Sequence, residues 1–278
     1  MEILSKIRIL PTIFACLGIL FLSGNCQVGK HAGHRFSRLV WSDEFNGSGL
    51  PDSTKWGYDL GDGCPNICGW GNNEKQYYSK NRLENSRVEN GFLVIEAHRE
   101  SIGSRNFSSA RMVTKNKGDW RYGRIEVRAK LPHGKGIWPA IWMLPTSWEY
   151  GGWPRSGEID IMEFVGYNPD TVFATVHTEF YNHVKGTQKS LGIYSETLNS
   201  EFHVYAIEWD AKKIDFYFDQ TKFSTFKNLG EGVNGWPFDQ KFHLILNIAV
   251  GGNWGGKMGI DESIFPQKML VDYVRIYQ

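Results

Sequence analysis

The stretch Gly157–Glu163, GEIDIME, decides the fold that we expect of this chain. Acidic and apolar residues alternate in it, as they do in a β-strand whose two faces differ. In a regular pleat Glu158 and Asp160 share one face, and Glu163 points to the other. One extra residue around positions 161–162, a β-bulge, returns Glu163 to the face of the other two acids. The stretch therefore predicts a bulged strand that carries three carboxyl groups in a row.

Such a row suits the hydrolysis of glycosidic bonds. Carboxyl groups at neighbouring positions of one strand face lie roughly 5 to 7 Å apart, the range in which a retaining glycosidase sets a nucleophile against a general acid/base. Asp160 between the two glutamates would orient the nucleophile, and its charge would raise the pKa of a neighbouring acid. The alternative for these residues alone is a half-exposed edge strand with solvated acids.

Composition narrows the class of ligand. The net charge is +1 with no long run of one sign, which argues against nucleic acid or a strongly anionic polymer as the main partner. Eleven tryptophans in 278 residues suit a cleft that stacks flat, weakly charged ligands such as sugar rings. About half of these tryptophans are expected to be core residues instead.

The N-terminus predicts export. Lys6 and Arg8 precede an apolar stretch, residues 9–22, that is too short for a comfortable membrane span. We expect residues 1–26 to be a signal peptide, with secretion or an outer-surface or periplasmic location. Cys26 follows residues 22–25 (LSGN), which match a bacterial lipobox poorly. A lipid anchor on Cys26 is therefore kept as the alternative to free secretion.

The rest of the chain is predicted to be a polar linker, residues 27–37, and one catalytic domain, residues 38–278. Strands at short spacing, separated by Gly, Asn, Asp and Pro clusters, indicate an all-β sandwich of two antiparallel sheets, and no helical pattern exceeds two turns. Besides the acidic stretch, the expected strands are 92–98, 124–130, 138–144, 171–179, 202–209, 213–218, 243–249 and 270–277.

Four motifs in order give the chain a family resemblance. They are Glu158–Glu163 (EIDIME), Trp138–Pro145 (WPAIWMLP), Asn247–Gly256 (NIAVGGNWGG) and Phe265–Tyr277 (FPQKMLVDYVRIY). Over roughly residues 39–278 the chain closely resembles glycoside hydrolase family 16, the laminarinase-type endo-β-1,3-glucanases. The resemblance implies a β-jelly-roll whose concave sheet forms an open cleft, and a mechanism that retains anomeric configuration. It makes Glu158 the nucleophile, Asp160 its assistant and Glu163 the acid/base.

Within that family the acidic motif has the longer E-x-D-x-x-E spacing, which laminarinases share with agarases and carrageenases, whereas lichenases use E-x-D-x-E. The loop Gly69–Tyr78 (GWGNNEKQYY) resembles the laminarinase cleft loop, in which Asn73 and Glu74 would meet sugar hydroxyls. The small net charge also fits a neutral glucan better than a sulfated galactan.

Further substrate contacts are expected from aromatic and polar residues near these motifs. For each of them the alternative is packing or a structural hydrogen bond; a lone histidine, for example, is more often structural. The candidates are Trp138, Trp142, Trp153, Arg155, His177, Asn247 and Trp254. Trp41, Trp120 and Trp209 are assigned to packing.

No cofactor is expected for catalysis. Members of the resembled family often bind a structural calcium, and the matching positions here are Glu44, the carbonyl of Gly91, and Asp272, which are oxygen ligands of the kind calcium prefers. Cys64 and Cys68 are expected to form a disulfide in an exported protein, with free thiols or a weakly supported zinc site as alternatives.

The sequence therefore predicts a monomeric, exported endo-hydrolase of laminarin-type β-1,3-glucan that acts by double displacement. The enzymatic alternatives are mixed-linkage β-1,3-1,4-glucan, agar or carrageenan as substrate, and transglycosylation in place of hydrolysis. The alternative of another class is a non-catalytic β-glucan-binding protein, which would not need the three acids.

Overall fold

The computed structural model describes residues 35–278. The predicted signal peptide, Cys26 and residues 27–34 of the predicted linker lie outside the described residues. Within the described part, no helix is long and apolar enough to cross a membrane.

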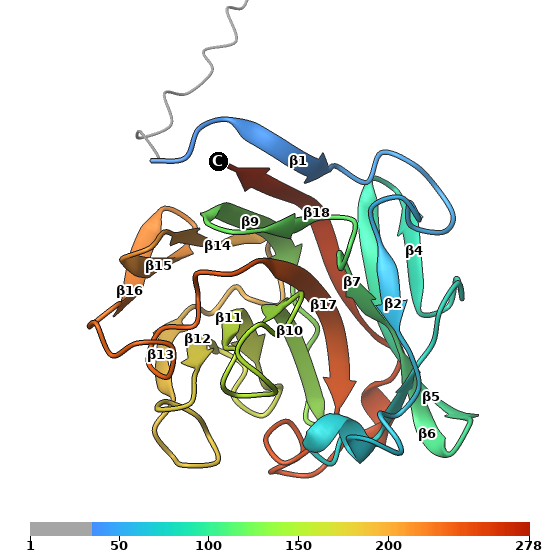
Figure 1. Cartoon of the computed structure of the whole chain (residues 1–278). Coiled ribbons are helices and arrows are strands. Elements are labelled where there is room, and N and C mark those ends of the chain that lie inside the picture. Colours follow the sequence, from blue (N-terminus) through green and yellow to red (C-terminus); the bar gives the residue numbers. More distant parts are fainter. Residues whose placement is uncertain (1–34) are drawn as a thin grey trace, which may run out of the picture. The chain divides into compact units, whose positions relative to one another are not determined.

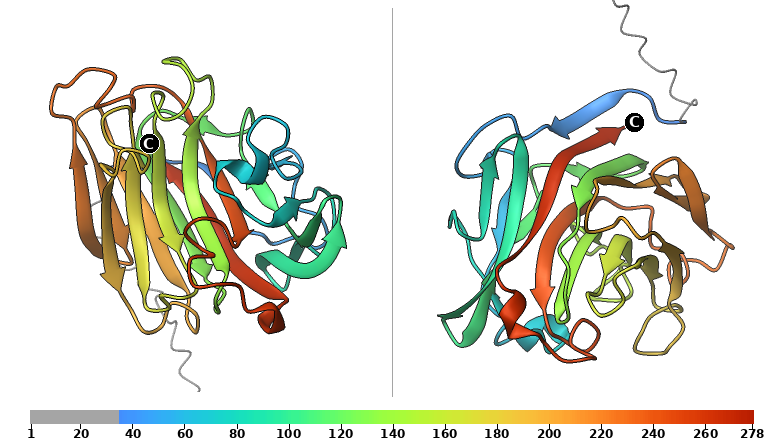
Figure 2. Two further views of the ribbon diagram at one scale, coloured as in Figure 1. Left: turned by 90° about the horizontal axis from the view of Figure 1, so that it is seen from below. Right: turned by 180° about the vertical axis from the view of Figure 1, so that it is seen from behind.

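Two sheets stacked face to face form the described domain (Figures 1 and 2). The larger, sheet A, runs in the order β16 (Thr221–Lys227), β15 (Lys213–Phe218), β14 (His203–Trp209), β9 (Gly123–Lys130), β18 (Gln267–Tyr277), β5 (Phe92–Ile102), β6 (Arg105–Ser109) and β3 (Gln76–Tyr78). In addition, β1 (Leu39–Asp43) pairs with β18, and β4 (Ser86–Glu89) pairs with β5.

The smaller sheet, sheet B, carries the acidic stretch. Its order is β13 (Lys189–Tyr194), β12 (Thr171–His177), β11 (Glu158–Phe164), β10 (Ile137–Pro145), β17 (Phe242–Val250), β7 (Arg111–Val113) and β2 (Gly57–Asp59), and β8 (Asp119–Trp120) pairs with β17. The two helical segments of the described chain are the short 3₁₀ turns η1 (Cys68–Gly71) and η2 (Glu262–Ile264).

The predicted all-β jelly-roll sandwich is confirmed. Its strand pairs are antiparallel except β3 with β6, which is parallel. The alternating stretch 213–218 forms β15 with the same bounds, and 138–144 lies inside β10. Short strands such as β7, β13 and β16 were not predicted.

The core lies between the two sheets and is built from the alternate residues of each strand that point inward. Ile125 and Val127 of β9 and Leu244 and Leu246 of β17 have no exposed surface. Burial of apolar side chains throughout this core is the dominant favourable contribution to folding. The three tryptophans that were assigned to packing do pack: Trp120 and Trp209 are buried, and Trp41 lies against the core through edge contacts with Trp56 and Trp120.

The predicted bulge is present in β11. β10 pairs with β17 without a break from Ile137 to Pro145, yet its register with β11 shifts between Ile141 and Trp142, so the extra residue belongs to β11. On the other side, Asp160 faces Thr175 and Glu163 faces Phe173, which leaves two residues of β11 opposite one of β12.

Candidate active site

The bulge turns both of its own residues inward. Ile161 and Met162 are buried in the core, whereas Glu158, Asp160 and Glu163 lie on the opposite face of sheet B. There they stand opposite His177, Thr175 and Phe173 of β12 in the antiparallel register. The strand therefore presents the three carboxyl groups as one row, as its spacing predicted.

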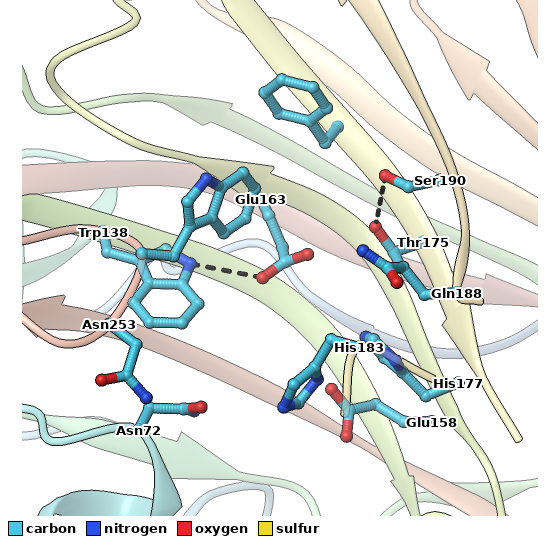
Figure 3. Close-up of a pocket in the computed structure, with 12 residues that line it drawn as sticks. Asn72, Trp138, Glu158, Glu163, Thr175, His177, His183, Gln188, Ser190 and Asn253 are labelled. Atoms are coloured by element: carbon cyan, nitrogen blue, oxygen red, sulfur yellow. Dashed lines mark hydrogen bonds between the residues drawn. The ribbon is translucent and has the colours of Figure 1, made fainter. Parts of the chain in front are cut away.

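The row lies at the bottom of a cleft made of two hollows. The first, with a volume of about 450 Å³, contains Glu158 and Glu163 and extends over β12 to Ser190 of β13 (Figure 3). The second shares both glutamates and extends the other way, over Trp142 of β10 to β17 and β7. The cleft thus crosses the strands of sheet B, with the two glutamates where the hollows join.

Glu158 is held by a tryptophan from the turn before its strand. The indole Nε1 of Trp153 donates a hydrogen bond of 2.6 Å to Glu158 Oε2. The ring of Trp153 lies 5.0 Å from that of His183 and 5.8 Å from that of His177. These contacts fix the carboxylate from the side of β12, which leaves its other oxygen, Oε1, without an indole donor.

Glu163 is suited to hold a proton. Burial, followed by the negative charge of Glu158, raises its pKa to about 8, against the lowering effect of hydrogen bonds from Trp138 and Thr175. The Trp138 bond joins indole Nε1 to Glu163 Oε1 at 3.2 Å (Figure 3). Sequence reasoning gave the acidic neighbours the leading part, whereas burial is the larger cause. Glu163 is therefore protonated at neutral pH.

Asp160 lies between the glutamates and is nearly inaccessible, with 2% of its surface exposed. Burial raises its pKa well above the usual value, and the charges of Glu158 and Glu163 and a hydrogen bond with Glu158 add to this rise. The shift favours a proton on Asp160, shared with Glu158, over a second negative charge beside the outer carboxylate.

His177 belongs to the same group. Its Nε2 lies 3.4 Å from Asp160 Oδ2, and burial lowers the pKa of the imidazole, which is neutral as a result. His177 Nδ1 is buried and has no hydrogen-bond partner among the described residues. Buried polar atoms without a partner are uncommon in folded proteins, so this nitrogen is a hydrogen-bonding group that the described residues leave unused.

Trp142 and Asn247 connect the row to the predicted cleft loop. Trp142 Nε1 donates to Asn247 Oδ1 at 2.7 Å, and Asn247 Nδ2 donates to the Tyr78 hydroxyl at 3.0 Å. Glu74 is buried and accepts a hydrogen bond of 2.6 Å from Gln76. Trp138 and Trp142 share the cleft face, and neither belongs to the sandwich core.

The remaining predicted contacts divide into two groups. Trp254 lines the first hollow, where its ring packs edge-on against those of Trp138 and Phe173. Asn73 is exposed and bonds Asn253 across the loop, and Arg155 is exposed in the turn before β11; neither lines either hollow.

Sequence reasoning missed Arg111, the residue that completes the second hollow. Its guanidinium lies between the rings of Trp70 and Trp142, at 4.5 and 4.6 Å from their centroids, and pairs with Asp59 at 2.9 Å. Arg111 reaches the cleft because β7 pairs with β17, more than 130 positions later in the chain, a pairing with no local signal. His183 was also missed.

Two predictions concern structure away from the cleft. Cys64 and Cys68 form the predicted disulfide. The strand register puts neighbours of the three expected calcium positions on adjoining strands of sheet A, because β1 ends beside Val274, next to Glu44, and Leu93, near Gly91, lies opposite Val271, next to Asp272. Both expected carboxylates pair with guanidinium groups, Glu44 with Arg275 and Asp272 with Arg128.

Comparisons with known proteins match this chain to glycosyl hydrolases. The family model described as "Glycosyl hydrolases family 16" matches residues 73–275. The chain is similar to a protein named beta-glucanase from Rhodothermus marinus, with 53% identity over 249 residues that cover 86% of this chain and 85% of the relative.

Solved structures agree with this. A laminarinase from Rhodothermus marinus superposes with a TM-score of 0.83 and 53% identity, covering 87% of this chain and 97% of that one. A mutant of a non-specific endo-β-1,3(4)-glucanase, crystallised with 1,3-β-D-cellotriosyl-glucose, has a TM-score of 0.83 and 46% identity, covering 88% and 96%.

Proposed function

The chain belongs to family 16 of the glycosyl hydrolases, and from this premise we propose that it is an endo-acting, retaining enzyme that cleaves laminarin-type β-1,3-glucan. The observation that carries the proposal is the bulge of β11, which turns a half-buried, protonated Glu163 toward the same cleft face as Glu158.

The mechanism follows from the protonation states of the row. Glu163 gives its proton to the leaving glycosidic oxygen while Glu158 attacks the anomeric carbon, so that a covalent glycosyl-enzyme forms and the C–O bond breaks. Glu163, now ionised, takes a proton from water, which attacks the same carbon and releases Glu158. Both displacements occur at one carbon, and its configuration is retained.

The neighbours of the glutamates prepare them for these roles. The Trp153 hydrogen bond and the proton of Asp160 orient Glu158 and hold it as the anion that attacks. The indole of Trp138 donates a hydrogen bond to Glu163. This bond becomes stronger once Glu163 has lost its proton, because hydrogen bonds to a charged acceptor are stronger than those to a neutral one.

A neutral glucan is the substrate that the lining supports best. Trp138, Trp142, Trp254 and Trp70 offer rings for sugar stacking. Among the described residues that line the two hollows, Arg111 is the one lysine or arginine, and it pairs with Asp59, so this lining offers no cluster of cations to a sulfated galactan. A relative whose printed name is glucan endo-1,3-beta-glucosidase, from Cryptopygus antarcticus, is 42% identical to this chain and supports the linkage.

Three further properties belong to the proposal. Export follows from the expected signal peptide, with Cys26 as the position of a lipid anchor if one is attached. A structural calcium would be held by Glu44, the Gly91 carbonyl and Asp272, away from the catalytic cleft. We expect the enzyme to act as a monomer.

The test is product release from a panel of polymers by the wild type and Glu158→Ala. Release of reducing sugar from laminarin should exceed that from mixed-linkage glucan, agar and carrageenan, and Glu158→Ala should lose about 10⁴-fold or more in turnover while it still binds oligosaccharide. A variant that kept a tenth of the activity would refute the role of Glu158. Binding of laminarin without any product from the wild type would favour a non-catalytic glucan-binding protein.

A further inference from the structure

A third hollow lies beyond the end of the catalytic cleft. It has a volume of about 400 Å³, in the size range of small-molecule sites, and opens at the edge of the sandwich between β13 and β16. We call it the rim hollow. Figure 1 shows β13, the edge strand of sheet B, beside β16, the edge strand of sheet A.

The rim hollow is continuous with the cleft. Gln188 and Ser190 line both the rim hollow and the hollow that contains Glu158 and Glu163. The cleft crosses the strands of sheet B from β7 to β13, and the rim hollow continues in that direction to β15 and β16. A linear polymer that lies across the strands would pass from one into the other.

The lining of the rim hollow has the chemistry of a sugar site. Tyr181 and Phe226 form an aromatic wall, with ring centroids 5.9 Å apart; Lys189 Nζ lies 4.5 Å over the Tyr181 ring, and Phe226 stacks on Trp236 behind it. Leu229 adds an apolar side chain that is 69% exposed. The side chains of Gln188 and Lys227 make no hydrogen bond or ion pair with any described residue. Partly covered aromatic rings and an exposed leucine beside polar side chains that can hydrogen-bond are a combination that can bind sugars, which present apolar ring faces and hydroxyl edges.

We propose that the rim hollow is a distal binding site for the same neutral glucan chain whose scissile bond lies at Glu158 and Glu163. The inference rests on the proposed function. Its occupant is the continuing part of the polymer, and a short oligosaccharide would not reach it. The site would therefore favour long chains over short ones without a change in the chemical step.

The experiment compares a polymer with an oligosaccharide in matched variants. Tyr181→Ala removes one half-buried ring of the wall, and Ser224→Trp fills the hollow from β16. Tyr194→Ala is the control, because Tyr194 is a 62% exposed aromatic on the same edge strand, β13, and does not line the hollow. For each variant kcat/KM is measured on laminarin and on laminaritetraose.

Both rim variants should lose about fivefold to tenfold in kcat/KM on laminarin, equivalent to about 1 to 1.4 kcal/mol, and change less than about twofold on laminaritetraose. Tyr194→Ala should match the wild type on both. An unchanged ratio of laminarin to laminaritetraose in a folded Ser224→Trp variant would overturn the inference, as would an equal loss in Tyr194→Ala. A wild type inactive on laminarin would overturn the proposed function and the inference with it, whereas an active wild type with unaffected rim variants overturns the inference alone.

Discussion

The hydrogen bond from Trp138 to Glu163 should lower the pH at which activity is lost on the alkaline side. Glu163 must be protonated to act as the acid, so kcat/KM should fall as pH rises through its pKa of about 8. The indole N–H, 3.2 Å from Oε1, stabilises the ionised form and so lowers that pKa. Trp138→Phe keeps an aromatic ring in the cleft and removes this donor.

The magnitude follows from the strength of such a bond. A hydrogen bond to a charged group contributes about 1.5 to 3 kcal/mol, and the same bond to the neutral acid is weaker but not absent. Trp138→Phe should therefore remove roughly 1.4 kcal/mol by which the bond favours the carboxylate form of Glu163 over the neutral form. That corresponds to about one pKa unit. The alkaline limb of Trp138→Phe should therefore lie about one unit above that of the wild type, although the activity at the optimum falls.

The assay is the pH profile of kcat/KM on laminarin, because it reports the free enzyme. Trp142→Phe is the matched control: it loses an indole N–H from the same strand, but that group donates to Asn247 and not to Glu163. Its alkaline limb should stay at the wild-type position. Samples held at each high pH and then assayed at neutral pH exclude unfolding. A Trp138→Phe limb that is unmoved, or displaced to lower pH, would refute the assignment of that limb to Glu163.

Three further outcomes are expected. Burial raises the pKa of Glu163 from 4.5 in the unfolded chain to about 8, so its contribution to stability is present below pH 4.5 and is lost as pH rises through 8. The free energy of unfolding of Glu163→Gln, measured by thermal denaturation, should therefore increase relative to that of the wild type by roughly 2 to 4 kcal/mol between pH 5 and 8. Arg111→Met, which removes the cation packed on Trp142, should raise KM for laminarin several-fold with a smaller change in kcat, and an unchanged KM would exclude a substrate-binding role for Arg111. If calcium binds at Glu44 and Asp272, a chelator should lower the Tm of the wild type but not that of Glu44→Gln, and an equal Tm with and without calcium would contradict the site.

The sequence was sufficient for the catalytic row because the signal there is local. The spacing of Glu158, Asp160 and Glu163 within one strand requires a bulge if all three are to share a face, and the observed register has it. The long alternating strands were found for the same reason. In contrast, β13 is exposed over most of its length and carries little hydrophobic pattern, so neither this strand nor the rim hollow beside it could be predicted.

Two properties of the site depend on distant parts of the chain. Arg111 enters the cleft through the pairing of β7 with β17, which only the complete sheet order determines. The main cause of the raised pKa of Glu163 is burial, and burial depends on everything packed around the carboxyl group. The sequence shows which charged residues are neighbours along the strand but not how deeply they are buried. The prediction from sequence therefore overstated the share of the neighbouring charges in the raised pKa of Glu163.

The tryptophans of the cleft have a second use that composition did not reveal. Their abundance indicated stacking on sugar rings, but Trp138, Trp153 and Trp142 each also donate an indole N–H, to Glu163, Glu158 and Asn247 respectively. Phenylalanine would supply the ring without the donor, and tyrosine would carry its polar group at the end of the ring in place of the side. Trp138 thus lines the cleft and orients Glu163 as well, whereas Trp153, which lines neither hollow, orients Glu158 from the turn before β11. Substitution of Trp138 is for that reason expected to change the pH dependence of the chemical step together with the affinity for substrate.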